Sequence, residues 1–186
     1  MGLWIFLAVV VLLLVYAVAV YNRLVRLRAL VHEGFSGITV QLRRRADLVP
    51  NLVETVKGYA IHERETLDQV TAHRTDAMNA GSVAATAQAD NAMTAMLGRL
   101  FAVAEAYPEL KADANFRELQ GELSSLETEL QSARRYYNAT ARDLNTRIFS
   151  FPDMLFATPM GFKEEPYYED ADPAIQSAPK VEFQRP

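Results

Sequence analysis

The chain has 186 residues, a formal net charge of −4 and no cysteine, and 50% of its residues are hydrophobic. The lack of cysteine excludes disulfides, thiolate metal sites and cysteine nucleophiles. The slightly acidic balance gives no reason to expect nucleic acid as a partner. Once an apolar N-terminal stretch is set aside, roughly 165 residues remain, which is enough for one domain with a sizeable core.

The N-terminal stretch is uncharged from Leu3 to Val20, and the first charged side chain after it is Arg23. A helix of about 19 residues rises roughly 28 Å, close to the ~30 Å hydrocarbon core of a bilayer. Aromatic side chains, which prefer membrane interfaces, lie near both ends of the stretch. We therefore predict a transmembrane anchor over residues 1–22. The residues that mark the two ends of its span are Leu3, Trp4, Ile5, Val20 and Tyr21.

A cleaved secretory signal is the competing interpretation of this stretch. Ala17, Val18 and Ala19 match the small-x-small pattern of a cleavage site. A signal peptide, however, has a positively charged N-terminal region and an apolar core of about 7–15 residues. This N-terminus has no lysine or arginine, and its apolar run is longer. The sequence therefore favours a retained anchor.

The charges that flank the span predict its orientation. Arg23, Arg26 and Arg28 follow the span directly, whereas only the α-amino group precedes it. Basic residues are enriched on the cytoplasmic side of membrane helices. We therefore expect a single-pass protein with its N-terminus outside and the bulk of the chain in the cytoplasm.

Beyond the anchor, apolar residues recur every three or four positions, which is typical of helices that pack along one face. This spacing predicts four helices, over residues 23–46, 50–79, 83–106 and 113–150. The first continues from the membrane span and is expected to end before Pro50, because proline disfavours helical geometry in the residue before it. In the fourth, a 3.5-residue period over about four heptads is typical of coiled-coil packing.

The predicted fold class is all-α: a single N-terminal transmembrane helix that continues into an antiparallel bundle of long helices, followed by an irregular C-terminal tail. The bundle is expected over residues 23–157 and the tail over residues 158–186. The predicted core positions of the bundle are Leu52, Val56, Leu67, Val70, Met96, Leu100, Phe116, Leu119, Leu123, Leu126, Leu130, Tyr137 and Leu144.

The tail is acidic and carries a proline every few residues. No regular helix of more than a few residues fits between prolines at this spacing. Two interpretations stay open. In the first, the tail is disordered or lies along the bundle. In the second, its aromatic residues dock on a partner or a neighbouring subunit. These aromatic residues are Phe162, Tyr167, Tyr168 and Phe183.

Motifs for catalysis, cofactors or metals were sought and none was found. His62-Glu63 begins like a zinc-protease helix, but Thr66 stands where the second histidine is required. None of the three histidines has a glutamate three residues before it, as a di-iron bundle requires. A phosphate-binding loop, a nucleophile elbow and a dinucleotide fingerprint are also missing. We therefore expect a protein without catalytic activity, cofactor or metal.

Two polar features leave alternatives open. Glu63 falls on the apolar stripe of the second predicted helix. It lies either at the bundle edge, paired with an arginine, or inside the bundle, where it would fix helix register against Arg134 or Arg135. The arginines at 43–45 form a solvated helix face, a contact with helix C-terminal carbonyls, or a patch for acidic lipid or a partner.

Three segments resemble the LemA family of bacterial membrane-anchored proteins. They are YNRLVRLRALVHEGFSGITVQLRRRADLVPNLVETVKGYAIHERETL from Tyr21, AYPELKADANFRELQGEL from Ala106 and ARRYYNATARDLNTRIFSFPDMLFA from Ala133. The match covers most of residues 1–165 and includes polar residues. It departs at Leu144-Asn145, where a second Tyr-Asn pair like Tyr137-Asn138 is expected. The resemblance implies a single N-terminal anchor in the bacterial inner membrane and an all-helical cytoplasmic domain, and it supplies no catalytic activity.

These features predict a non-enzymatic helical scaffold anchored in the bacterial inner membrane. We expect it to form a homo-oligomer and to organise or remodel membrane, with lipids as its partners and no nucleic acid. The alternative is a signalling or envelope-stress adaptor that binds a protein partner through the exposed face of the bundle.

Overall fold

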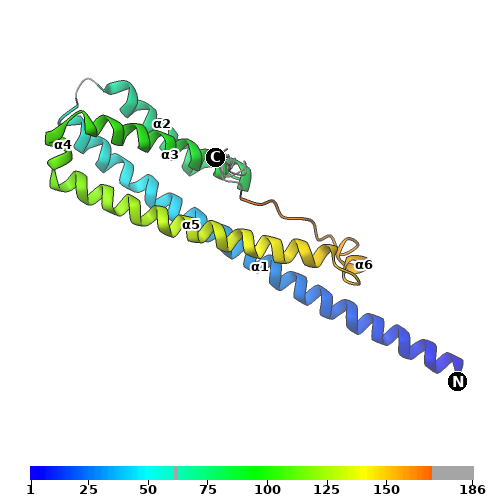
Figure 1. The fold of residues 1–186 in the computed structure, drawn as a ribbon. Coiled ribbons are helices and arrows are strands. Elements are labelled where there is room, and N and C mark those ends of the chain that lie inside the picture. The colour runs from blue at the N-terminus through cyan, green and yellow to red at the C-terminus, as the bar shows by residue number, and fades with distance from the viewer. Residues whose placement is uncertain (61–62, 169–186) are drawn as a thin grey trace, which may run out of the picture.

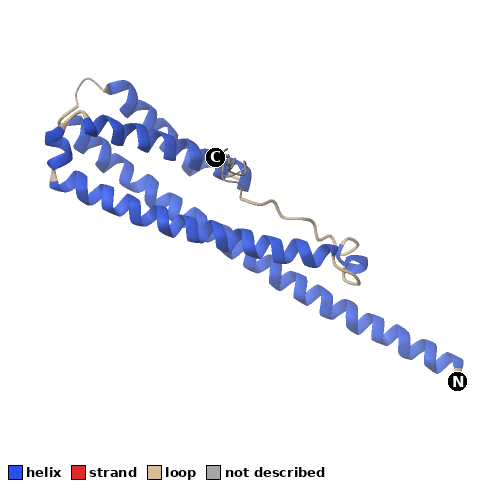
Figure 2. Ribbon diagram, viewed as in Figure 1, coloured by secondary structure: helices blue, strands red, loops and turns tan. Residues whose placement is uncertain are grey.

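In a computed structural model the described residues are 1–60 and 63–168, and these form helices and no strand (Figure 2). The helices are α1 (Gly2–Lys57), α2 (Arg64–Asn79), α3 (Val83–Glu105), α4 (Pro108–Ala112), α5 (Ala114–Phe149) and α6 (Met154–Ala157). The all-α class predicted from the sequence is confirmed.

The longest element is α1, a single helix of 56 residues that at 1.5 Å per residue extends over about 84 Å. Its N-terminal part projects beyond the bundle. Its later part lies beside α5, and α2 and α3 cover the end farthest from the N-terminus (Figure 1). The most apolar 18-residue window of α1 has a mean hydropathy of 3.0, and 6% of that window is buried. The helix is therefore long and apolar enough to cross a membrane, and its exposed apolar part is unlike the core helix of a soluble protein.

The break predicted before Pro50 is wrong, because α1 continues to Lys57. Inside a helix, proline cannot donate the hydrogen bond that the carbonyl four residues earlier would accept. Here that carbonyl belongs to Ala46, and it accepts a hydrogen bond from Nε of Arg74 on α2 at 2.8 Å. A side chain of the neighbouring helix thus replaces the missing donor. The second predicted helix is correspondingly shorter and begins at Arg64.

Two later helices begin at capping side chains. Oγ of Ser82 accepts a hydrogen bond from the backbone N–H of Ala85 at 3.2 Å. Oδ1 of Asp113 accepts one from the N–H of Phe116 at 2.9 Å. Each bond satisfies a donor that the first helical turn leaves unpaired. These caps explain why α3 and α5 begin close to the predicted positions.

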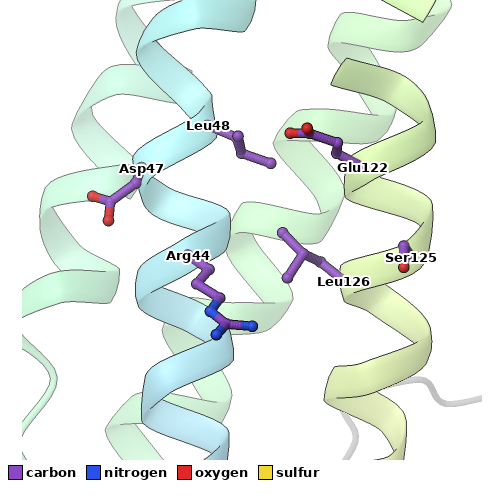
Figure 3. Close-up of a pocket in the computed structure, with 6 residues that line it drawn as sticks. All are labelled: Arg44, Asp47, Leu48, Glu122, Ser125 and Leu126. Atoms are coloured by element: carbon purple, nitrogen blue, oxygen red, sulfur yellow. The ribbon is translucent and has the colours of Figure 1, made fainter. Parts of the chain in front are cut away.

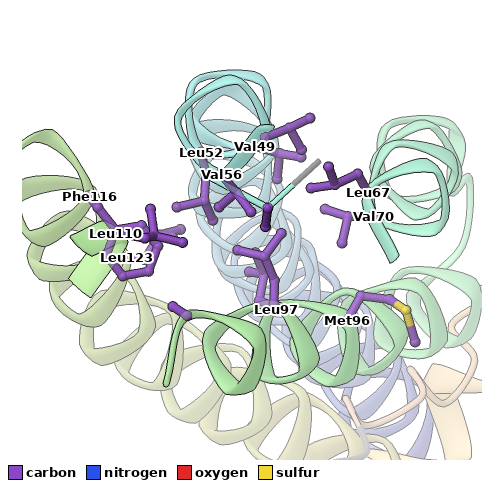
Figure 4. Packing of buried hydrophobic residues seen from close by; sticks show 14 of the residues in the cluster. Val49, Leu52, Val56, Leu67, Val70, Met96, Leu97, Leu110, Phe116 and Leu123 are labelled. Atoms are coloured by element: carbon purple, nitrogen blue, oxygen red, sulfur yellow. The ribbon is translucent and has the colours of Figure 1, made fainter. Parts of the chain in front are cut away.

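Buried apolar side chains form two clusters along the bundle. The distal cluster lies between the second half of α1, α2, α3, α4 and the start of α5 (Figure 4). It includes Val49, Leu52, Val56, Leu67, Val70, Met96, Leu97, Leu110, Phe116 and Leu123. The proximal cluster lies mainly between α1 and α5, nearer the projecting helix. It includes Val20, Leu24, Val31, Ile38, Leu42, Leu130, Tyr137, Leu144 and Ile148.

The α1 and α5 backbones come close together at Gly34. A Cβ atom at this position would lie 3.0 Å from Cα of Tyr137, closer than real Cβ atoms normally come to backbone. Glycine permits this approach because it has no side chain. Beside it, the rings of Phe35 and Tyr137 pack with their centroids 6.0 Å apart.

After α6 the chain reverses at Gly161, whose φ of 80° lies in the left-handed region that favours glycine. Residues 162–168, here called the strap, then run back along α5 (Figure 1). This part of the predicted tail therefore lies along the bundle. Residues 169–186, including Phe183, lie outside the described residues.

Candidate functional site

The most conspicuous polar feature of the bundle is a buried carboxylate, Asp90 on α3, which is 0% exposed. Its Oδ1 accepts a hydrogen bond from Nη1 of Arg45 on α1 at 3.2 Å. Its Oδ2 accepts one from Nη2 of Arg134 on α5 and another from the hydroxyl of Tyr168 in the strap at 2.8 Å. One carboxylate thus joins three helices and the strap.

A second carboxylate balances the charge of the two arginines. Oε2 of Glu127 lies 3.1 Å from Nη1 of Arg45, and its Oε1 lies 3.6 Å from Nη1 of Arg134. Oγ1 of Thr94 accepts a further hydrogen bond from Arg45 at 3.0 Å. We call Arg45, Asp90, Glu127, Arg134 and Tyr168 the charge cluster. Buried charges are tolerated when they are paired and hydrogen-bonded in this way.

The charge cluster favours particular protonation states. Burial raises the pKa of Tyr168, and the neighbouring Asp90 raises it further. Burial of Arg134 opposes its charge, but Asp90, Tyr168 and Glu127 together outweigh this effect, and the pKa of the guanidinium is raised. Tyr168 therefore stays protonated and donates to the carboxylate, while Arg134 stays charged. The guanidinium of Arg134 also lies over the ring of Tyr168, with its Cζ atom 5.6 Å from the ring centroid.

Two asparagines of α5 hold the strap by its backbone. The side-chain amide of Asn145 exchanges two hydrogen bonds with the backbone of Glu165, both 2.9 Å. Asn138 does the same with Tyr168, at 3.0 and 2.8 Å. The asparagines are seven residues apart, about 10 Å along a helix, and three residues of extended chain span a similar length. The hydroxyl of Tyr137 donates to the carbonyl of Pro166 between them at 2.7 Å.

At the other end of the strap, the bundle meets α1 inside the predicted membrane span. The hydroxyl of Tyr16 donates to Oδ1 of Asp153 at 2.5 Å, and Arg147 forms an ion pair with the same carboxylate. Asp153 is 1% exposed. The ring of Phe156 packs edge-on against Tyr16 with centroids 5.7 Å apart. The bundle thus contacts the apolar stretch itself, not only the helix that follows it.

A shallow groove of about 420 Å³ runs between α1 and α5 on the outer face of the bundle. Leu48 and Leu126 point into it from the two helices, and Arg44 and Glu122 lie at its edges (Figure 3). Asp47 and Ser125 complete the lining. The groove therefore has an apolar floor and charges of both signs at its rim.

The predicted core positions are buried except for Leu119 and Leu126, which are only partly buried. On α5 the fully buried positions repeat every seven residues, at Phe116, Leu123 and Leu130 and onward to Tyr137 and Leu144. The second apolar row of the heptad pattern, which contains Leu119 and Leu126, lies beside this seam. Leu126 faces the groove. A 3.5-residue pattern identifies both rows but not which of them faces the core.

The predicted span residues occupy the projecting part of α1. Leu3, Trp4 and Ile5 are exposed. Val20 is buried in the proximal cluster, and the ring of Tyr21 packs against Phe162 with centroids 5.8 Å apart. The flanking arginines, Arg23, Arg26 and Arg28, are all exposed on α1.

The interpretation of Glu63 as a buried partner of Arg134 is wrong. Glu63 precedes the first residue of α2 and is partly exposed, and the carboxylate that pairs with Arg134 is Asp90. Sequence reasoning missed Asp90 because an aspartate is not counted when a buried helix face is traced by its apolar residues. The buried face includes Ala87, Asp90 and Met93. An acid three residues from apolar neighbours on each side was the available signal.

The three consecutive arginines at 43–45 do not form one surface. Arg45 is buried in the charge cluster, whereas Arg43 and Arg44 are exposed. Successive residues of a helix point about 100° apart, so three neighbours cannot share one environment. Among the described residues, no group of three histidine, aspartate or glutamate side chains is arranged to hold a metal ion.

Comparison with known families gives a match over most of the chain. The model of the LemA family matches residues 34–183. The chain belongs to the LemA family. At Leu144-Asn145, where the resemblance predicts a Tyr-Asn pair, Asn145 holds the strap and Leu144 is buried in the proximal cluster.

Similar proteins share only part of their length with this LemA family member. Magnetosome protein MamQ 2 and MamQ 1 from Paramagnetospirillum magneticum are each 25% identical over 176 residues, which cover 81% of this chain and 65% of the relative. Protein LemA from Metamycoplasma hominis is 27% identical over 131 residues, covering 70% of this chain and 60% of the relative. The chain thus spans less than two thirds of the length of these relatives.

Proposed function

We propose that this protein is a non-enzymatic scaffold, anchored in the bacterial inner membrane, that self-associates laterally and so organises or remodels membrane or membrane proteins. The observation that carries the proposal is the continuity of α1, which extends without a break from its apolar stretch to Lys57. Because α5 packs along α1, the bundle is a rigid extension of the anchor. Membership of the LemA family supports the membrane-associated role.

A retained anchor is supported by the contacts of the apolar stretch. Cleavage after Ala19 would remove Tyr16, which donates a hydrogen bond to the buried Asp153. The buried carboxylate would lose a partner, a loss that is costly for a group sheltered from water. Val20, the next residue, belongs to the proximal cluster. The mature bundle therefore needs the end of the span for its own packing.

The groove between α1 and α5 supports self-association through this face. In a two-fold symmetric contact the same surface meets itself, so the basic side of the groove at Arg44 faces the acidic side of the groove on the other copy. Arg44 is 3.7 Å from Glu129 within its own chain, but such an exposed pair contributes little and is readily exchanged. Leu48 and Leu126 supply the apolar area between these charges.

Sedimentation of the full chain in a density-matched mild detergent tests the proposal. We expect species larger than the 20.8 kDa protomer; a strict monomer at concentrations like those in cells would contradict the scaffold. Neighbouring serines of α5 provide a matched pair, because Ser125 lines the groove and Ser124 does not. Ser125→Trp is expected to weaken association at least tenfold, about 1.4 kcal/mol, while Ser124→Trp leaves it unchanged.

The adaptor is the alternative that this experiment separates. A monomer that retains the same groove would favour binding of a different protein through the bundle face. Cross-linking in intact cells, followed by mass spectrometry, would then recover a heterologous partner attached near the groove rather than a second copy.

A further inference from the structure

The turn between α5 and α6 ends the bundle with an unusual surface. We call residues 149–156 the tip. Four of its large apolar side chains are exposed: Phe149, Phe151, Met154 and Leu155 are 61%, 78%, 45% and 59% exposed, whereas Phe156 packs against Tyr16. Four large apolar side chains exposed within seven residues are a candidate interaction surface. The proximal cluster does not use these side chains.

The position of the tip along α1 indicates its depth relative to the bilayer. Tyr16, whose hydroxyl donates to Asp153 of the tip, lies seven residues before the first flanking charge, Arg23. At 1.5 Å per residue, this contact is about 10 Å inside the charged boundary of the span. When the apolar stretch of α1 crosses a bilayer, the tip is therefore at the depth of the hydrocarbon layer just below the headgroups, on the side that holds the bundle. Figure 1 shows α6 beside α1 where the projecting part begins.

The charges around the tip suit this depth. Between Arg147 and Lys163 the only charged residue is Asp153, which is buried and paired with Arg147 and Tyr16. The single acid of the tip thus faces the protein. Lys163 is exposed just beyond the tip, where a basic side chain can meet anionic headgroups.

We propose that the tip inserts into the membrane interface beside α1, so that the protein is attached to the lipid at two points: its spanning helix and this apolar turn. The occupant of the exposed apolar surface is the bilayer itself, on the side that holds the bundle. Interfacial segments bind by burying apolar side chains at the boundary between headgroups and acyl chains. The inference rests on the proposed anchor.

Single-cysteine spin labelling tests the insertion directly, because the chain has no native cysteine. Three variants of the full chain, each reconstituted in vesicles of phosphatidylcholine and phosphatidylglycerol, are compared. Leu12→Cys reports the span, Phe151→Cys the tip and Val40→Cys an exposed apolar position on α1, about 25 Å beyond Arg23. All three native side chains are exposed, so the substitutions leave the packing intact.

The readout is the collision of each label with oxygen, which concentrates in lipid, and with a water-soluble nickel chelate. We expect labels at 12 and 151 to favour oxygen several-fold over the chelate, and the label at 40 to show the reverse. A label at 151 that favours the chelate lies in water, and one shielded from both reagents lies against protein; either result overturns the insertion. If the label at 12 also fails to favour oxygen, the anchor and the proposed function fall with it. A second tip variant, Leu155→Cys, is expected to repeat the result at 151.

Discussion

Asp90 accepts hydrogen bonds from Arg45, Arg134 and Tyr168, which lie far apart in the sequence. Removing this carboxylate takes away a charged partner of two buried guanidinium groups, those of Arg45 and Arg134. Breaking a buried pair by removing one partner is much more costly than losing an exposed pair. The stability of the bundle should therefore depend on this residue more than on the exposed acids.

We predict that Asp90→Ala lowers the free energy of unfolding by about 3–5 kcal/mol, measured by denaturant titration of the full chain in detergent. Glu63→Ala is the control, because Glu63 is partly exposed at the start of α2 and surface changes of this kind stay within about 0.5 kcal/mol. Equal effects of the two substitutions would show that the charge cluster contributes no special stability.

A tyrosine in contact with the strap predicts a pH dependence. Burial raises the pKa of Tyr137 to about 12, and the nearby Glu165 carboxylate adds to the shift. In the unfolded chain the phenol has a pKa of about 10. The folded state therefore holds this proton more tightly. The corresponding stability is fully present below pH 10 and is lost as the pH rises from about 10 to 12.

We predict that Tyr137→Phe flattens the loss of stability above pH 10, by on the order of 1.4 kcal/mol for each pH unit in this window. Some slope remains, because burial raises the pKa of Tyr168 as well. The matched control is Tyr136→Phe, since Tyr136 is 45% exposed. Unfolding curves recorded between pH 8 and 12 provide the measurement, and parallel profiles for the two variants would contradict the assignment.

At the scale of helices, the contact between α1 and α5 depends on Gly34. A methyl group there would meet the backbone of Tyr137 at 3.0 Å, whereas one at Gly37 would meet no atom within 4 Å. We predict that Gly34→Ala destabilises the bundle by about 1–3 kcal/mol through overpacking. Gly37→Ala should stabilise it by up to about 1 kcal/mol, because alanine favours helix. Thermal unfolding of both variants measures the difference, and a shift of the same sign in both would count against close helix packing at Gly34.

The sequence predicts a helix boundary well when local interactions determine it, and poorly when contacts with another helix determine it. The caps at Ser82 and Asp113 are local, and the corresponding helix starts were predicted to within one residue. The break before Pro50 was wrong because the compensating donor, Arg74, comes from another helix. Local rules carry no information on that donor. The strap was left open for a similar reason, since its hydrogen bonds to Asn138 and Asn145 link segments about 20 to 30 residues apart.

The candidate site was the least predictable part. Apolar spacing identified most of the buried seam of α5, but the burial of Asp90 was signalled only by its position three residues from Ala87 and Met93. A buried ion pair depends on the rotation of three helices at once, so a small error in the predicted rotation of one helix conceals it. The tip was likewise assigned to the end of the bundle without a role, because its depth follows from the contact between Tyr16 and Asp153.

At the scale of the whole molecule, the exposed arginines that follow the span predict its orientation. A reporter that is active only in the cytoplasm, fused after Pro186, is expected to be active in cells, because basic flanks stay on that side. Replacing Arg23, Arg26 and Arg28 together by glutamine should produce a mixture of orientations and lower the signal. An inactive reporter on the unaltered chain would place the bundle on the opposite side.

Because α1 is unbroken, a tilt of its membrane-spanning part also moves the bundle. From Arg23 to Lys57 the helix extends about 50 Å, and no hinge separates this arm from the part that crosses the bilayer. Membrane helices adjust to bilayer thickness by leaning. A lean of about 10° would swing the far end of such an arm by roughly 9 Å. A change in the thickness of the lipid around the anchor would thus appear as a lateral displacement at the remote end of the helix.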